Sequence, residues 1–261
     1  HTPWDWQPEL KQEAERCGLI FFSTPFDQSA VEFLETLEVP AYKIASFEIV
    51  DLPLLRCVAA TGKPVILSTG MSSPEEIEEA VETLKNNGAK QIALLKCTSA
   101  YPAHPDEMNL LSLTTLRDHF KVPVGLSDHS LDPSVPVAAV ALGASIIEKH
   151  FILARSLGGP DAAFSLEPDE MRQTVQAIRN TAAALGSKEI VVQERAKPNL
   201  VFRRSIFAVK DIARGELFTR ENIRIIRPGY GLHPREFEAV LGRCASADIR
   251  RGTPLSLELM D

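Results

Sequence analysis

Six short apolar segments recur along residues 19–151, and in each of them the apolar residues are consecutive instead of alternating with polar ones. The segments read LIFFS, YKIAS, VILS, IALLKC, VPVGLS and SIIEKHF. Consecutive apolar residues over this length are typical of strands that are covered on both faces of a parallel sheet. Helical stretches separate the segments, and one begins at Ser73 and Pro74, which suit the N-cap and the first helical position. This alternation predicts parallel βα units.

Each apolar segment closes on a polar residue. The intervals between these residues are 23, 22, 31, 28 and 23 positions, and the residues are Ser23, Ser46, Ser68, Ser99, Ser127 and His150. The spacing is typical of a βα-barrel, in which the carboxyl ends of the strands form the rim that carries the active site. A serine at any one strand end could simply cap the next helix. Six polar ends in succession favour a ligand site.

The number of predicted strands is too small for a closed barrel, which needs eight. The chain opens at HTPWDWQPEL, and the residues that follow it resemble the end of a helix. We therefore expect an α/β fold, a (β/α)8 TIM barrel that lacks its first one or two βα units in this chain. An open, doubly wound sheet of six strands is the alternative.

The pattern changes after residue 186 and predicts a second domain. Residues 1–186 form the partial TIM barrel, whose last helix begins near Glu167 and stops at Gly186. Residues 187–200 are mixed and polar, as expected of a linker. Residues 201–261 hold short β-type runs broken by Gly and Pro, with a basic excess. They predict a small β-rich module near the lower size limit for independent folding.

Composition and charge narrow the function classes. The net charge of −7 and the scattered Lys and Arg residues argue against a nucleic-acid surface, so a small-molecule substrate is expected. The four cysteines, Cys17, Cys57, Cys97 and Cys244, are far apart, which indicates reduced thiols and not a zinc knot or a disulfide framework. No apolar run has the length of a membrane span and no charged-then-apolar leader precedes the first strand. We therefore expect a cytoplasmic protein.

Two histidines, His129 and His150, end adjacent predicted strands. Neutral imidazoles suit Mn, Zn or Fe, and two of them leave coordination positions for water and substrate oxygens. A lone histidine at such a place is more often a packing residue, but two on neighbouring strand ends make a metal pair a real alternative. In VGLSDHS, residues 124–130, the intervening Asp128 should point to the other side of the strand. We interpret it as a helix cap or as a partner that orients an imidazole.

A cationic and hydroxylic group is predicted at the same rim. Lys43 lies inside a buried strand, which is costly unless its ammonium group meets an anion. With hydroxyl groups beside it, Lys43 could hold a phosphate or carboxylate. The hydroxyl residues are Thr24, Ser46, Ser68, Ser99 and Ser127. Alternatively, Lys43 pairs with Glu48 or Glu148 and holds nothing. Glu48 and Asp161 are the acidic candidates for proton exchange or for orienting a sugar hydroxyl.

Several ordered motifs together resemble the sialic acid synthase family, whose members condense phosphoenolpyruvate with an N-acetylated sugar aldehyde. The motifs are FFSTPFDQSAVEFLETLEVPAYKIASFEIVDLPLL, GKPVILSTGMSSPEEIEEAV, LLKCTSAYPA, VGLSDHS, IIEKHF and GGPDAAFSLEPDE. The resemblance covers nearly the whole chain, and the tail is similar to the family's antifreeze-like (SAF) domain. GGPDAAFSLEP and ASFEIVDLPL look more like pseudaminic acid synthases than N-acetylneuraminate or legionaminate synthases.

The resemblance implies roles for the candidate residues. His129 and His150 would bind a divalent ion, Mn²⁺ or Mg²⁺, with Glu48 beside the reacting atoms. Phosphoenolpyruvate would be cradled by Thr24, Lys43, Ser46, Ser68, Ser99 and Ser127, although neuraminate synthases tend to carry Asn at the position of Ser99. The sugar would be met by Tyr101, Asp161 and, across a domain-swapped homodimer, Arg227. Family members also use a glutamate and a lysine from the first two barrel units that this chain does not show, so we expect these 261 residues alone to be nearly inactive.

Two other classes remain alternatives on the residues alone. A metal-dependent aldolase or isomerase could use the same barrel, because a fold does not dictate its chemistry. A carbohydrate-binding or ice-binding protein is the non-enzymatic alternative. Ice binding would need a flat, Thr-rich face, whereas DIARGELFTRENIRIIRPG is charged and holds little Thr.

Overall fold

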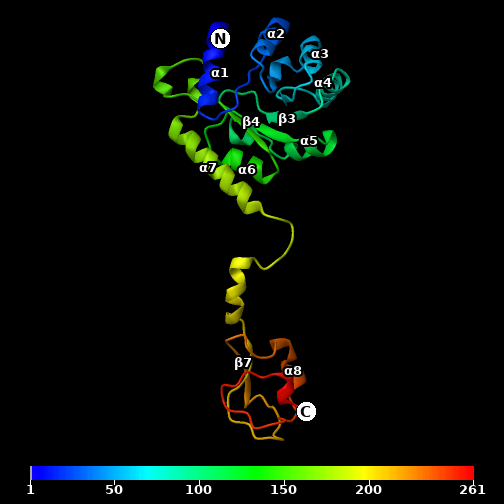
Figure 1. The fold of residues 1–261 in the computed structure, drawn as a ribbon, viewed down its shortest axis with the longest axis vertical. Helices are drawn as coiled ribbons and strands as arrows, with labels where there is room; N and C mark the ends of the chain where they lie inside the picture. The colour runs from blue at the N-terminus through cyan, green and yellow to red at the C-terminus, as the bar shows by residue number, and fades with distance from the viewer. Residues whose placement is uncertain (1) are drawn as a thin grey trace. The chain divides into compact units, whose positions relative to one another are not determined.

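The computed structural model describes residues 2–261, which divide into two compact units between Gly186 and Ser187. The first unit contains a five-stranded parallel sheet with the strands in chain order (Figure 1). Its strands are β1 (Tyr42–Ile44), β2 (Val65–Ser68), β3 (Ile92–Cys97), β4 (Val124–Asp128) and β5 (Ile146–Lys149). Parallel neighbours in chain order require a helical crossover between each pair of strands, as the alternating pattern predicted.

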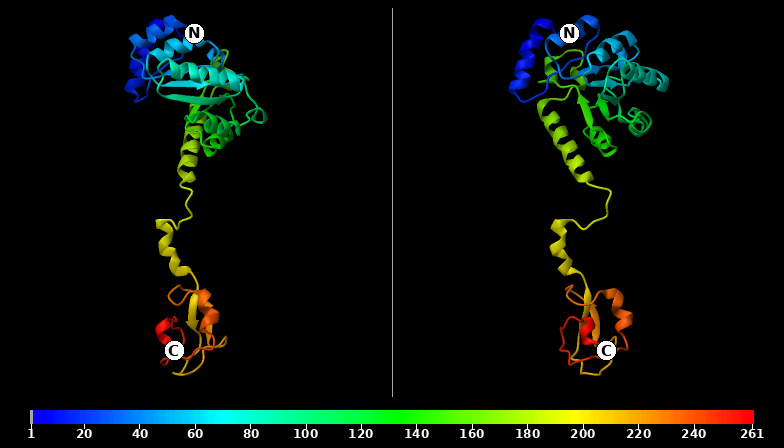
Figure 2. Two further views of the ribbon diagram at one scale, coloured as in Figure 1. Left: turned by 90° about the vertical axis from the view of Figure 1, so that its right-hand side faces the viewer. Right: turned by 45° about the vertical axis from the view of Figure 1, so that its right-hand side comes forward.

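The described part of the first unit, residues 2–186, has seven α-helices of eight or more residues (Figure 2). They are α1 (Gln7–Arg16), α2 (Gln28–Thr36), α3 (Leu52–Ala60), α4 (Pro74–Asn86), α5 (Ser112–Phe120), α6 (Ser134–Ala141) and α7 (Pro168–Leu185). Helix α4 begins where the sequence predicted, with Ser73 and Glu76 forming a reciprocal capping box. Helix α7 has Glu167 at its N-cap and Gly186 at its C-cap.

The sheet is curled, and this makes it part of a barrel and not an open doubly wound sheet. Lys43 on β1 and Glu148 on β5 belong to the two outermost strands, yet their charged atoms are 3.6 Å apart. Side chains from the two edges of a flat sheet could not meet, because neighbouring strands are about 4.8 Å apart. The fold is therefore the predicted incomplete (β/α) barrel.

The first predicted strand, residues 19–23, is the one that the structure does not form. Only Ser23 makes a β-bridge, to Tyr42, and the chain before it is irregular. Leu19 and Ile20 are 62% and 77% exposed. The prediction of a strand covered on both faces was wrong here, because this segment lies at the edge of the sheet with only β1 beside it.

The core of the first unit lies between the sheet and its helices. Tyr42, Leu67, Leu94 and Leu126 from four of the strands are fully buried. Gly125 in β4 has no room for a side chain, because an added Cβ would lie 2.4 Å from the Ile146 carbonyl oxygen. This glycine therefore lets β4 and β5 approach closely just before the residues that form their carboxyl ends.

The second unit has a core of its own. Strand β6 (Ser205–Ala208) pairs antiparallel with β7 (Ile223–Ile226), and a short helix α8 (Phe237–Val240) follows. Ile206, Phe218 and Ile223 are among its fully buried residues. A 3-10 helix over Glu194–Phe202 occupies much of the predicted linker. No helix within residues 2–261 combines the length and the apolar character that crossing a membrane requires.

We expect Gly125→Ala to destabilise the first unit. The new methyl group must displace the backbone of β5 and the side chain of Leu95, and overpacking of this kind costs about 1–3 kcal/mol of unfolding free energy. Urea unfolding followed by far-UV circular dichroism measures the loss. An unchanged midpoint would contradict the close approach of the two strands.

Candidate functional site

The pairing of β4 with β5 places the candidate residues in matched rows. Ser127 lies opposite Glu148, Asp128 lies opposite Lys149, and the next position on each strand end is a histidine. Successive side chains of a strand point to opposite faces. Ser127 and His129 therefore share one face with Glu148 and His150, while Asp128 and Lys149 point to the other.

A cationic centre forms on the first of these faces. The Nζ atom of Lys43 lies 3.6 Å from Glu148 Oε2 and donates a hydrogen bond to the Ile44 carbonyl at 2.9 Å. Ser127 Oγ donates to the other Glu148 oxygen at 2.6 Å. Lys43 is only 8% exposed. Burial lowers the pKa of Lys43, and the neighbouring carboxylate of Glu148 opposes this shift.

Hydroxyl groups gather around the turn that follows β2. The amide of Gly70 donates to Ser46 Oγ at 3.0 Å. An added Cβ on Gly70 would lie 2.2 Å from Ser99 Oγ and 2.8 Å from Ser46 Oγ, so both serines lie against this glycine. Ser68 Oγ is buried and has no hydrogen-bond partner among the described residues. Such an atom is rare in a folded protein, and a polar ligand could satisfy it.

The two histidines predicted as a metal pair lie next to each other. The ring centroids of His129 and His150 are 5.3 Å apart. The Nδ1 atom of His129 lies 2.9 Å from the Thr98 carbonyl oxygen, which leaves its Nε2 atom for another partner. Burial lowers the pKa of His129, but contacts with Cys97 and Thr98 outweigh burial and raise it. Burial and the charge of His129 lower the pKa of His150.

An acidic and aromatic rim surrounds the histidine pair. Asp161 Oδ2 lies 3.7 Å from His150 Nδ1. The ring centroid of Tyr101 is 4.4 Å from that of His129, and that of Phe164 is 4.9 Å from that of His150. Both predicted sugar-facing residues of the first unit, Tyr101 and Asp161, therefore border the histidines.

Glu48 lies at the edge of the cationic centre with one carboxylate oxygen buried. Its Oε2 atom has no hydrogen-bond partner among the described residues. Burial raises the pKa of Glu48, while the charge of Lys43 partly opposes the shift. Burial of this kind favours the protonated form of a carboxyl group.

Cys97 is a member of this group that the sequence did not single out. Its side chain is buried, and its Sγ atom lies 3.7 Å from Ser99 Oγ. Burial raises the pKa of Cys97, but hydrogen bonds with His129, Ser46 and Ser99 outweigh burial and lower the pKa to about 7. The thiol is a polar member of the site.

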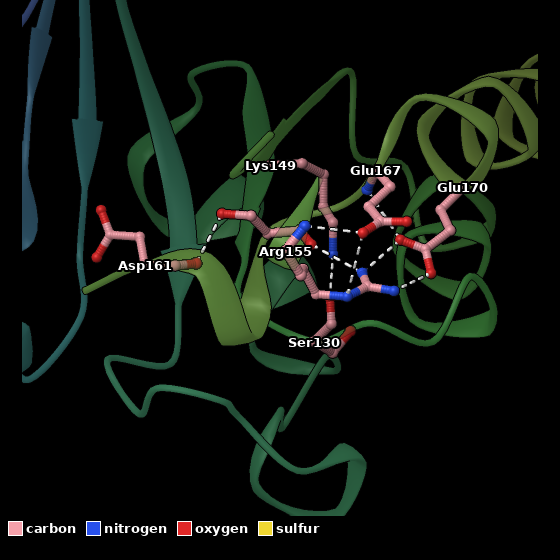
Figure 3. Close-up of polar contacts among 7 residues, drawn as sticks. Ser130, Lys149, Arg155, Asp161, Glu167 and Glu170 are labelled. Atoms are coloured by element: carbon pink, nitrogen blue, oxygen red, sulfur yellow. Dashed lines mark hydrogen bonds and ion pairs between the residues drawn. The ribbon is translucent and has the colours of Figure 1, made fainter. Parts of the chain in front are cut away.

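Asp128 points away from the histidines as expected, but its predicted partner was wrong. It forms a buried ion pair with Lys149, whose Nζ lies 2.8 Å from Asp128 Oδ2, and it accepts from the Ser130 amide at 2.9 Å. Lys149 also donates to the Ser130 carbonyl (Figure 3). The carboxylate neither caps a helix nor hydrogen-bonds an imidazole. It instead pairs with the buried ammonium group of Lys149, which lies opposite it on β5.

The last two predicted residues are Thr24, in the first unit, and Arg227, in the second unit. Thr24 is half-buried beyond Ser23 and lines a hollow with Phe22 and Phe33. No hydrogen bond within residues 2–261 joins Thr24 to the cationic centre. Arg227 is exposed in the second unit, before a cis peptide bond to Pro228.

Three residues of the site were not predicted as members, and they are Gly70, Cys97 and Phe164. Glu148 was predicted only as a possible partner of Lys43, and the structure shows that pair. Gly70, Cys97 and Phe164 had no comparable signal, because close approach and aromatic packing depend on residues far away in the chain.

The donor set fits a divalent ion held in part by the protein. His129 and His150 offer two imidazole nitrogens, and no cluster of three or more His, Cys, Asp or Glu suited to a metal occurs in residues 2–261. A metal bound here would take its other ligands from water and substrate oxygens, which is the arrangement of a Lewis-acid site with open positions.

Comparisons with known proteins agree with this architecture. The NeuB family model matches residues 1–190, and the SAF domain model matches residues 203–259. Pseudaminic acid synthase of Campylobacter jejuni is 44% identical over 97% of this chain and 74% of its own length. N,N'-diacetyllegionaminic acid synthase of the same species is 43% identical over 93% of this chain and 73% of its own length.

A solved structure shares the fold. The spore coat polysaccharide biosynthesis protein SpsE of Bacillus subtilis aligns with a TM-score of 0.68 and 36% identity, covering 100% of this chain and 78% of that one. The match extends over both the incomplete barrel and the C-terminal module.

Lys149→Met should leave the Asp128 carboxylate buried without its counter-ion. Removing one partner of a buried pair typically costs about 3–5 kcal/mol of unfolding free energy, so this variant should unfold at a clearly lower urea concentration. The double variant D128N/K149M removes both charges and keeps an acceptor for the Ser130 amide, so it should recover most of the loss. Lys197→Met, which breaks an exposed pair, is the control. Equal stability of K149M and the unmodified protein would show that the pair is not stabilising.

Proposed function

The chain belongs to the NeuB family, and we propose that it is a nonulosonic acid synthase that condenses phosphoenolpyruvate with an N-acetylated amino-sugar aldehyde. The proposed aldehyde is 2,4-diacetamido-2,4,6-trideoxy-L-altrose, and the products are pseudaminic acid and phosphate. The observation that carries the proposal is the meeting of a buried lysine, several hydroxyls and two histidines at one end of the parallel sheet. The motifs GGPDAAFSLEP and ASFEIVDLPL support the choice of sugar.

The reaction makes one carbon–carbon bond and breaks one carbon–oxygen bond. C3 of phosphoenolpyruvate attacks the aldehyde carbon, water adds to C2, and phosphate leaves with the bridging oxygen. Lys43, with its partner Glu148, would meet the phosphate or carboxylate through a charge-assisted hydrogen bond. The hydroxyls of Ser46, Ser68 and Ser127 would orient the same substrate. Holding both reactants in line is the main contribution that such groups make to the rate.

Glu48 would act on a proton at its buried Oε2 atom. Burial raises its pKa, so it can take the proton of the attacking water or return one to the new sugar hydroxyl. His129 and His150 would hold Mn²⁺ or Mg²⁺, which when bound supplies Lewis-acid polarisation of an oxygen. Asp161 and Tyr101 would face the amino sugar beside them.

The second unit is part of the same proposal. Arg227 is exposed there, as a residue that reaches the sugar of another subunit in a domain-swapped homodimer would be. The match to the SAF domain supports this role.

A legionaminic acid synthase is the second candidate. The relative with that activity is 43% identical, nearly the same as the pseudaminic acid synthase. Overall identity therefore does not separate the two sugars. The motifs GGPDAAFSLEP and ASFEIVDLPL favour the first.

The substrate is tested with the full-length gene product that carries this chain. With Mn²⁺ and phosphoenolpyruvate, we expect the trideoxy-L-altrose derivative to yield pseudaminic acid, identified by mass. Phosphoenolpyruvate labelled with ¹⁸O at the bridging position should give labelled phosphate. Product from N-acetylmannosamine or the legionaminate precursor alone would refute the assignment of the sugar, and unlabelled phosphate would refute C–O cleavage.

His129→Ala and His150→Ala should each abolish Mn²⁺-dependent turnover while the far-UV circular dichroism spectrum stays unchanged. His119→Ala is the matched control, because His119 is exposed on α5 and should leave turnover unchanged. Direct Mn²⁺ binding, followed by electron paramagnetic resonance, should weaken in the first two variants only. Full activity of both variants would remove the histidine pair from the mechanism.

A further inference from the structure

The loop that follows β5 leaves the site and returns to it. The amide of Leu166 donates to the His150 carbonyl at 2.9 Å, and the amide of Ile152 donates to the Leu166 carbonyl at 3.0 Å. Residues 153–165 therefore form a closed loop whose two ends lie together beside His150. This loop carries Asp161 and Phe164, which border the histidine pair.

One side chain fastens both ends of this loop to helix α7. The guanidinium group of Arg155 makes a bidentate pair with Glu170, with N···O distances of 2.6 and 2.7 Å. It also donates to the Ser165 carbonyl at 3.0 Å, and its own amide donates to Glu167 Oε1 at 2.8 Å (Figure 3). Arg155, near the beginning of the loop, thus contacts Ser165 at its end.

A short series of contacts leads from Arg155 to the site. Ser165, whose carbonyl accepts from Arg155, donates its hydroxyl to the Asp161 carbonyl at 2.7 Å. The Asp161 carboxylate in turn lies 3.7 Å from His150 Nδ1. In Figure 3 the guanidinium group lies between the two glutamates and the turn that holds Asp161. A displacement of Ser165 would therefore move Asp161.

The anchor for this series is strong for a partly exposed contact. The Glu170 carboxylate accepts from Arg155 and from the Glu167 amide at 2.8 Å, and these hydrogen bonds lower the pKa of Glu170 to about 2. Only a planar fork can make two parallel bonds to one carboxylate and a third to a carbonyl. The side chain of Arg155 is 31% exposed and lies outside the residues proposed to touch substrate.

We propose that Arg155 is a positioning residue for the amino-sugar side of the site, which holds Asp161 and Phe164 against His150 by fastening the 153–165 loop to Glu170. The expected change of KM rests on the proposed function, whereas the attachment of the 153–165 loop to Glu170 rests on the contacts above. It assigns the loop to the sugar and leaves phosphoenolpyruvate to residues of other strands. The two substrates should therefore respond differently when Arg155 is changed.

The test compares Arg155→Met and Arg155→Lys with the unmodified full-length gene product. Arg155→Met should raise KM for the amino sugar about tenfold or more, because a small misplacement of binding groups is costly. KM for phosphoenolpyruvate should change less than about twofold. The KM of Arg155→Lys for the amino sugar should be closer to that of Arg155→Met than to that of the unmodified protein, since an ammonium group cannot reproduce the bidentate contact. Backbone hydrogen exchange should accelerate within residues 154–166 and stay unchanged in α4.

Two further variants make the outcome decisive. Arg172→Met removes an exposed pair with Asp169 on the same helix without touching the loop, and it should alter neither KM nor exchange. Glu170→Gln should reproduce the effects of Arg155→Met even if that variant folds poorly. Unchanged exchange in the loop, or faster exchange with an unchanged sugar KM, would overturn the proposal. If the unmodified protein condenses none of the sugars, the proposed function fails, and exchange alone decides whether Arg155 holds the loop.

Discussion

The register between β4 and β5 is the constraint on which the site depends. It sets Ser127 opposite Glu148 and Asp128 opposite Lys149, and the chain then continues into His129 and His150. Because side chains alternate between faces, a slip of β4 by one residue would turn Ser127 and His129 away from Glu148 and His150 and would separate Asp128 from Lys149. The close approach at Gly125 and the buried ion pair both oppose such a slip. The same few residues thus determine the packing of two strands and the spacing of the two imidazoles.

Curling of the sheet adds the second half of the site. Lys43 and Glu148 come from the outermost strands of the sheet and meet only because the sheet closes toward a barrel. The cost of burying Lys43 is offset in part by this carboxylate and by the Ile44 carbonyl. The ammonium group remains beside buried polar atoms, Ser68 Oγ and Glu48 Oε2, that have no partner among the described residues. The Ser68 hydroxyl could donate to an oxygen of a bound anion, whereas an ionised Glu48 could only accept from a donor.

Prediction from the sequence succeeded where the signal was local and repeated. Consecutive apolar residues located five strands, and the capping residues of α4 and α7 located the starts of their helices. It failed for residues 19–23, since apolar character alone does not show whether a neighbouring strand lies on both sides. The predicted partner of Asp128 was also wrong, because the pairing of β4 with β5 brings Lys149, 21 residues further along the chain, against its carboxylate. The role of Arg155 was not predicted, because its partner Glu170 lies 15 residues further along the chain.

The sequence by itself determined the βα alternation, the incomplete barrel, the polar residues at the strand ends and, through ordered motifs, the family. These properties follow from residue types within a few positions of one another, because secondary structure and strand-end chemistry are local. Only the tertiary structure decided that Lys43 meets Glu148, that Gly70 brings Ser46 against Ser99, and that Arg155 fastens the loop of Asp161. Those contacts join residues distant in the chain, and their existence depends on the curl of the sheet and the path of a returning loop.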